Sequence, residues 1–120
     1  MKTVTNAAAQ GDVILRRVPS IPNNAVERKH AGRIVIAHSE TGHHHAIDSK
    51  AIRHYEVPGD PLVCYLRMDG DMGEIGGVDV VHHRSWDTHE TIRLLGKSGD
   101  VWEVRRQREW TPEGWRRVLD

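Results

Sequence analysis

The sequence predicts an all-β fold, a single-domain barrel or sandwich of about eight strands, and two observations support this prediction. Gly, Pro, Asp and Asn recur about every 8 to 12 residues, and the segments between them are rich in Val, Ile and Trp, as is typical of short strands. No long segment has the apolar period of a helix. A chain of 120 residues fits one domain that buries roughly two-thirds of its unfolded surface.

The strands follow this punctuation in order along the chain. Residues 1–10 are expected to be a flexible N-terminus unless they add an edge strand, and residues 11–120 are expected to form the domain. Segment 21–32 is a polar connection with room for one helical turn. Strands are expected near Asp12–Val18, Arg33–Ser39, His43–Asp48, Ala51–Val57, Leu62–Met68, Val78–His83, His89–Leu95, Val101–Trp110 and Trp115–Leu119.

The most informative stretch is the predicted hairpin in which three consecutive histidines follow the Thr41–Gly42 turn. A two-residue loop would pair Glu40 with His43, His38 with His45, and Ile36 with Ile47. Because side chains alternate along a strand, three imidazoles and one carboxylate would then share the core-facing side. A turn with a bulge would instead pair His38 with His44 and spread the set over both faces.

This cluster has the ligand types of a divalent-metal site. Histidine nitrogens and a carboxylate with an open position suit Zn²⁺ or Fe²⁺. A second histidine-rich stretch, Val81–Glu90, offers a later histidine to complete the site. The predicted metal ligands are His38, Glu40, His43, His45, His83 and His89. A solvated polar hairpin tip and acid–base catalysis without metal remain open alternatives, and no substrate or reaction is indicated.

The single cysteine lies in the predicted strand that runs through Pro61–Met68. A lone Cys64 in an apolar run cannot form an internal disulfide and is expected to behave as a small buried hydrophobic side chain.

The predicted strand near Val101–Trp110 has an apolar first half and a basic, aromatic second half. Trp102 and Val104 have the parity of a core-facing stripe, and the same parity continues through Arg106 and Arg108 to Trp110. This strand is therefore expected to leave the core and offer a contact surface.

A terminal hairpin follows from Thr111–Gly114, which has Pro and Gly where a type I turn prefers them. A short Thr-capped helix is the alternative there. Arg and Trp are enriched at protein interfaces, so the predicted partner-binding residues are Arg106, Arg108, Trp110 and Trp115. The expected partner is another protein or a second copy, which would make a homo-oligomer.

Overall charge gives no reason to expect a nucleic-acid or membrane partner. Lys and Arg total 17, and so do Asp and Glu, so the chain has no net charge when histidines are neutral. No segment approaches the roughly 18 apolar residues of a membrane span, and the opening residues lack the apolar centre of a signal peptide. The expected location is the cytoplasm, or the host cytoplasm or virion for a phage-encoded protein.

Gly32, His38 and Glu40 resemble the glycine-to-histidine spacing of cupins, small β-barrels that hold one metal ion with histidines. The resemblance is partial, because Glu40 stands where the second histidine is expected and no Pro-x-Gly-x-x-His element follows. It implies a cupin-like barrel with a mononuclear metal site.

Four short stretches together resemble a group of small, functionally uncharacterised bacterial and phage proteins: Gln10–Leu15, Thr41–His45, His89–Leu94 and Arg105–Trp110. The resemblance implies that Thr41–His45 and His89 are signature positions, and it supplies no activity. A metal-binding protein, with or without enzymatic activity, and a non-enzymatic interaction protein such as a phage structural or accessory component are the two classes left open.

Overall fold

The computed structural model describes residues 1–38, 44–83, 90–111 and 114–117; at His38, His83 and residues 108–117 it describes the backbone alone. Every regular element in these ranges is a strand, which confirms the predicted all-β class. The strands are β1 (Lys2–Val4), β2 (Ala7–Gln10), β3 (Val13–Val18), β4 (Val26–Arg28), β5 (Ile34–His38), β6 (His44–Ile47), β7 (Ile52–Val57), β8 (Asp60–Met68), β9 (Gly77–His83), β10 (Ile92–Leu95), β11 (Val101–Arg106), β12 (Arg108–Thr111) and β13 (Gly114–Arg117).

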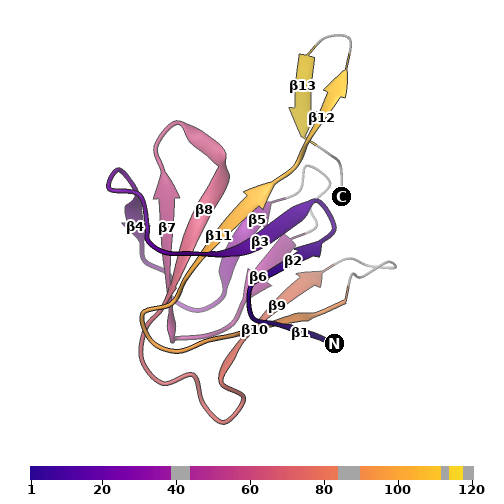
Figure 1. The fold of residues 1–120 in the computed structure, drawn as a ribbon. Helices are drawn as coiled ribbons and strands as arrows, with labels where there is room; N and C mark the ends of the chain where they lie inside the picture. The colour runs from indigo at the N-terminus through magenta and orange to yellow at the C-terminus, as the bar shows by residue number, and fades with distance from the viewer. Residues whose placement is uncertain (39–43, 84–89, 112–113, 118–120) are drawn as a thin grey trace.

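Two sheets form the body of the protein (Figure 1). One has five strands in the order β1-β10-β9-β6-β5, and the other has six in the order β2-β3-β11-β8-β7-β4. Neighbouring strands are antiparallel except β1 and β10, which are parallel. Neither sheet closes on itself, so the sandwich was the correct alternative and the cupin-like barrel was not.

The core lies between the two sheets because each sheet turns its apolar residues inward. Trp102 is fully buried and Val104 is 1% exposed, as their parity predicts. Cys64 is also buried, as expected for a small apolar side chain. The other fully enclosed apolar side chains are Val13, Leu15, Ile47, Leu66, Met68, Val80, Ile92 and Leu94.

The structure has more strands than the sequence predicts, and the additions lie at sheet edges. Residues 2–10 do not fray; they add β1 beside β10 and β2 beside β3. The polar connection 21–32 holds β4 rather than a helical turn. Gln107 separates β11 from β12, so the single strand expected near Val101–Trp110 is divided in two. The described ranges contain no helix that could serve as a membrane span.

One glycine is required by close packing rather than by a turn. Gly77, the first residue of β9, lies against β10, and a Cβ built there would stand 2.0 Å from the carbonyl oxygen of Leu94. That neighbour is backbone inside a paired strand, so it cannot move aside without disturbing the ladder.

Replacing Gly77 by Ala should therefore destabilise the fold. We expect Gly77→Ala to lower the free energy of unfolding by about 1–3 kcal/mol, the usual cost of forcing extra volume into a packed site. Urea denaturation measures this change. Ile75→Ala is the control, because Ile75 is 45% exposed in the preceding loop and its loss should cost less than about 0.5 kcal/mol. Equal stability of both variants would contradict the expected clash.

Candidate functional site

A β-bulge in β5 decides which face of the sheet each histidine of the β5–β6 hairpin occupies. From the base of the hairpin outward, the paired residues are Ile34 with Ile47, Val35 with Ala46, Ala37 with His45, and His38 with His44. Ile36 is therefore an extra residue on β5. An extra residue shifts all later positions of its strand by one, which moves them to the other face.

The predicted two-residue hairpin register is therefore wrong. It pairs His38 with His45 and Ile36 with Ile47, but the structure pairs His38 with His44. The histidines at 38 and 45 consequently occupy opposite faces of the sheet rather than one. The bulged pairing of His38 with His44, the alternative considered above, is the one observed, and the bulge lies at Ile36.

The inner face of this hairpin contributes a pair of buried histidines. His45 on β6 lies directly opposite His82 on β9. Their ring centroids are 4.3 Å apart, and both side chains are almost completely buried. A buried imidazole is costly unless its ring nitrogens are hydrogen-bonded. For His45, one hydrogen-bonding group comes from the opposite sheet.

That group is the side-chain amide of Gln10, the last residue of β2. Its Nε2 donates to the backbone carbonyls of Val80 and Glu90, each at 2.9 Å, and its Oε1 lies 2.8 Å from His45 Nδ1. Because two carbonyl oxygens require the NH₂ end, Oε1 is left to accept. His45 Nδ1 therefore carries the proton, and the tautomer follows from the contacts of Gln10.

Asp12 places a carboxylate beside the same imidazole. Its side chain is 1% exposed, with Oδ1 3.6 Å from His45 Nε2 and Oδ2 3.6 Å from the guanidinium of Arg106. Its backbone carbonyl accepts a hydrogen bond from the amide of Gln107 at 2.9 Å. A buried carboxylate needs a nearby positive charge, and Arg106 supplies one. The buried polar network comprises Gln10, Asp12, His45, His82 and Arg106.

This network ties the two sheets together. It joins β2 and β11 of the six-stranded sheet to β6 and β9 of the five-stranded sheet. An imidazole between an amide and a carboxylate has the donor order of an acid–base pair, but every member is more than nine-tenths buried. We therefore interpret the network as structural, since a substrate would need access to the ring.

Sequence reasoning missed most of this network for a local reason. Gly11 and Asp12 form a two-residue β2–β3 loop in which Gly11 has φ of 60°, and a Gly–Asp pair is an ordinary hairpin signal. Nothing marks Asp12 as buried. Arg106, expected on an exposed contact surface, is 8% exposed and lies against Asp12.

The predicted metal ligands fall into three groups. His45 belongs to the core network. Positions 38 and 83 lie opposite His44, one on each side of it. Outside the described residues are Glu40, His43 and His89. Among the side chains that the structure describes, no three His, Cys, Asp or Glu residues are grouped to hold a metal ion. The Zn²⁺ or Fe²⁺ site stays a prediction.

A second histidine pair, absent from the sequence prediction, lies near the β4 edge. His30 Nε2 is 2.9 Å from His54 Nδ1. His54 is 4% exposed, and burial together with the charges of His30 and Arg28 lowers its pKa to about 4. His54 is therefore neutral at physiological pH. The available signal was its parity with Ile52, which places both on the inward face of β7.

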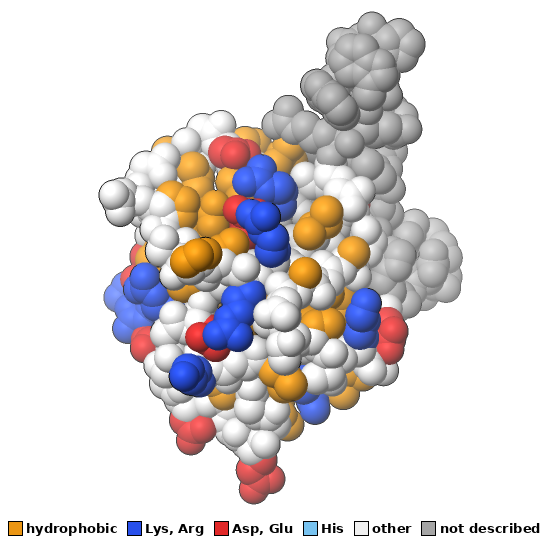
Figure 2. All heavy atoms as spheres, viewed as in Figure 1, with side chains coloured by type: hydrophobic (Ala, Val, Ile, Leu, Met, Phe, Trp, Pro, Cys, Tyr) orange, Lys and Arg blue, Asp and Glu red, His pale blue; other side chains and the backbone are white. Residues whose placement is uncertain are grey.

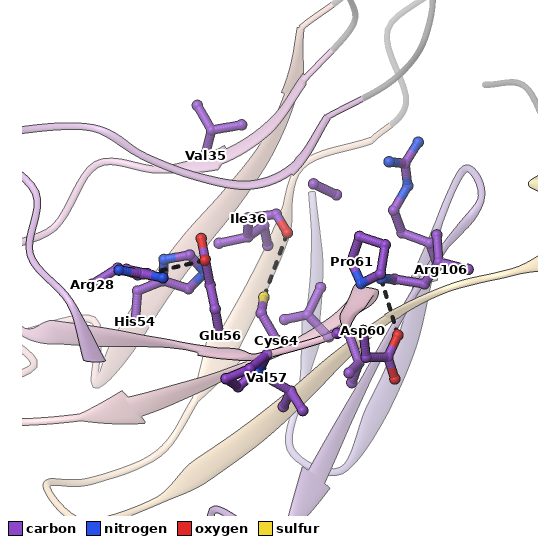
Figure 3. A pocket seen from close by; sticks show the side chains of 16 residues that line it. Arg28, Val35, Ile36, His54, Glu56, Val57, Asp60, Pro61, Cys64 and Arg106 are labelled. Carbon is purple, nitrogen blue, oxygen red and sulfur yellow. Dashed lines mark hydrogen bonds and ion pairs between the residues drawn. The ribbon is translucent and has the colours of Figure 1, made fainter. Parts of the chain in front are cut away.

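A cavity of about 620 Å³ lies between β5 and the β7–β8 turn (Figure 3). Arg28 and Glu56 form an ion pair at 3.1 Å in one part of its wall, and Arg106 lines another part. Between them the Cys64 thiol donates to the Ile36 carbonyl at 3.5 Å. Burial raises the pKa of Cys64 to about 12, so it is not a thiolate nucleophile. The cavity has the size of a small-ligand pocket.

Cross-strand ion pairs occupy the outer face of the six-stranded sheet. Glu103 is held by Arg16 and Arg105 at 3.3 and 3.2 Å and by the Tyr65 hydroxyl at 3.0 Å. On the face drawn in Figure 2, basic side chains lie beside acidic ones rather than in a separate basic patch. Burial alone would raise the pKa of Glu103, but these hydrogen bonds and charges hold it below its usual value.

Removing the amide of Gln10 should destabilise the sandwich. Gln10→Leu keeps a similar volume but leaves His45 Nδ1 and two backbone carbonyls without their hydrogen bonds. We expect a loss of about 2 kcal/mol or more in the free energy of unfolding, measured by urea denaturation. Gln107→Leu is the matched control, because that side chain is exposed and should cost less than about 0.5 kcal/mol. A loss no larger than the control's would show that the bridge contributes little.

Glu103 should make stability depend on acid pH. A carboxyl whose pKa is lowered by folding stabilises the protein above its unfolded pKa, near 4.5, and this contribution disappears as pH falls through the folded pKa. Glu103→Gln should therefore be less stable than wild type at pH 7, with a difference that narrows below about pH 4.5. Denaturation at several pH values measures this, with exposed Glu74→Gln as the control. A difference independent of pH would refute the role given to the charge.

Comparison with known proteins adds the family and no activity. No curated protein and no solved structure gives a significant match to this chain. Residues 9–107 match the family described as a domain of unknown function (DUF8820). The matched span includes the buried polar network and β5, β6 and β9, and it ends at Gln107, just before β12. Since the match covers most of the sequence, the chain belongs to this family of domains of unknown function.

Proposed function

We propose that this chain is a protein-interaction module that self-associates through its C-terminal arm, defined as β12 and β13. The observation that carries the proposal is the topology of the arm. Its strands pair with each other in a separate two-stranded sheet and add to neither sheet of the body. In Figure 1 the arm points away from both sheets.

A projecting arm of this kind gains stability from a partner. An isolated two-stranded hairpin is marginally stable in water, because it has no second layer to cover either face. The register places Trp110 opposite Trp115, a favourable aromatic pair, but it also places Arg108 opposite Arg117. Like charges directly opposite each other are destabilising. Contact with a surface that covers the tryptophans and supplies carboxylates would correct both deficits.

The composition of the arm fits such a contact. Trp and Arg are the residue types most enriched among those that dominate binding energy at protein interfaces. Arg106 is excluded from the proposed contact set, because it is buried beside Asp12 at the base of the arm. Gln107 is anchored there as well, through its amide and the Asp12 carbonyl. The proposed contact residues are Arg108, Trp110 and Trp115.

The oligomeric state in solution tests this proposal. Wild-type protein at tens of micromolar should sediment as a dimer or larger species, and Trp110→Ser with Trp115→Ser should sediment as a monomer. The matched control carries Ile14→Ser with Ile75→Ser, which removes two exposed apolar side chains from the body and should leave association unchanged.

A strictly monomeric wild-type protein would overturn self-association through the arm. So would an arm variant that keeps the wild-type mass while the body variant dissociates. Far-ultraviolet circular dichroism of each variant establishes that the body is folded, so loss of association can be assigned to the arm.

A further inference from the structure

The strand register brings three histidine positions into one line across the five-stranded sheet. β5, β6 and β9 are neighbours in that sheet. His38 of β5 pairs with His44 of β6, and His44 in turn pairs with His83 of β9. Directly opposite residues share a face of a sheet, so the outer row, defined as positions 38, 44 and 83, occupies one face.

That face is the outer one. The adjacent line of paired residues is Ala37, His45 and His82. These three are 4%, 1% and 0% exposed, which places their line against the core. Because successive strand positions alternate between faces, the outer row lies on the side away from the core. His44 is partly buried, which differs from the complete burial of His45.

We propose that His38, His44 and His83 form a binding site for one divalent transition-metal ion, with Zn²⁺ as the first candidate. Neighbouring opposite positions in a sheet have Cβ atoms about 5 Å apart, so the two outer positions are about 10 Å apart with His44 midway. Three neutral imidazoles are a ligand set that Zn²⁺, Cu²⁺ and Ni²⁺ accept, and three protein ligands leave a fourth position open.

This site differs in composition from the one that the sequence alone predicts. It keeps His38 and His83, and it takes His44 in place of His45. The exchange follows from the bulge at Ile36, which pairs His38 with His44. It also agrees with the role of His45, whose Nδ1 donates to Gln10 within the core.

Metal titration of tag-free, chelator-treated protein tests the proposal. Isothermal titration with Zn²⁺ should give a stoichiometry near one ion per chain, and Co²⁺ should develop visible absorption bands on binding. His44→Gln should weaken Zn²⁺ binding by more than about tenfold, a change as large as that caused by losing even an outer-shell partner of a metal site. His38→Gln and His83→Gln should weaken it similarly.

The matched control is His30→Gln, which removes an exposed histidine outside the row and should leave affinity unchanged. Wild-type protein that binds less than about 0.1 equivalent of Zn²⁺, Co²⁺ or Ni²⁺ at concentrations that give strong stabilisation of a binding protein would overturn the proposal. Unchanged affinity in folded His44→Gln would overturn it equally. Loss of binding in His45→Gln with wild-type affinity in His44→Gln would favour the inner set instead.

Discussion

The side-chain amide of Gln10 is the constraint on which the arrangement of this protein depends. It accepts from His45 and donates to the carbonyls of Val80 and Glu90, so one residue of the six-stranded sheet satisfies three polar groups of the facing layer. Apolar packing between sheets is tolerant of small sliding motions. Buried hydrogen bonds are not, because a shift that breaks them leaves polar groups desolvated and unpaired.

The bulge at Ile36 and this network together separate the histidines by role. The bulge pairs His38 with His44, while the network holds His45 in the core beside Asp12. The same carboxylate lies against Arg106, where β11 ends and the chain continues into the arm. The interior thus fixes both the outer row of histidines and the point from which the arm leaves the body.

Local patterns predicted the elements well, because burial on one face of a strand is a local property. The alternation of Trp102 and Val104 and the apolar run around Cys64 gave the correct core-facing residues. The bulge left no such mark. Ile34 to Ala37 are all apolar, so either parity of β5 satisfies the core, and only pairing with β6 reveals which one is used.

The network was equally hidden from sequence, because its members come from distant parts of the chain. Gln10 contacts a carbonyl 70 residues away and another 80 residues away. Asp12 in a tight turn has the composition of any solvated turn, and its burial depends on Arg106 at the far end of the domain. The arm was predicted as a hairpin from Pro and Gly spacing, because that signal is local.

The most direct test of this account is the protonation pattern of the His45 ring, observed by ¹H–¹⁵N nuclear magnetic resonance of the imidazole groups at neutral pH. The contacts of Gln10 predict a proton on Nδ1 that exchanges slowly with water, and its signal should disappear in Gln10→Leu. A His45 ring protonated only at Nε2, or one that exchanges freely with solvent in the folded wild type, would contradict the bridge between the sheets.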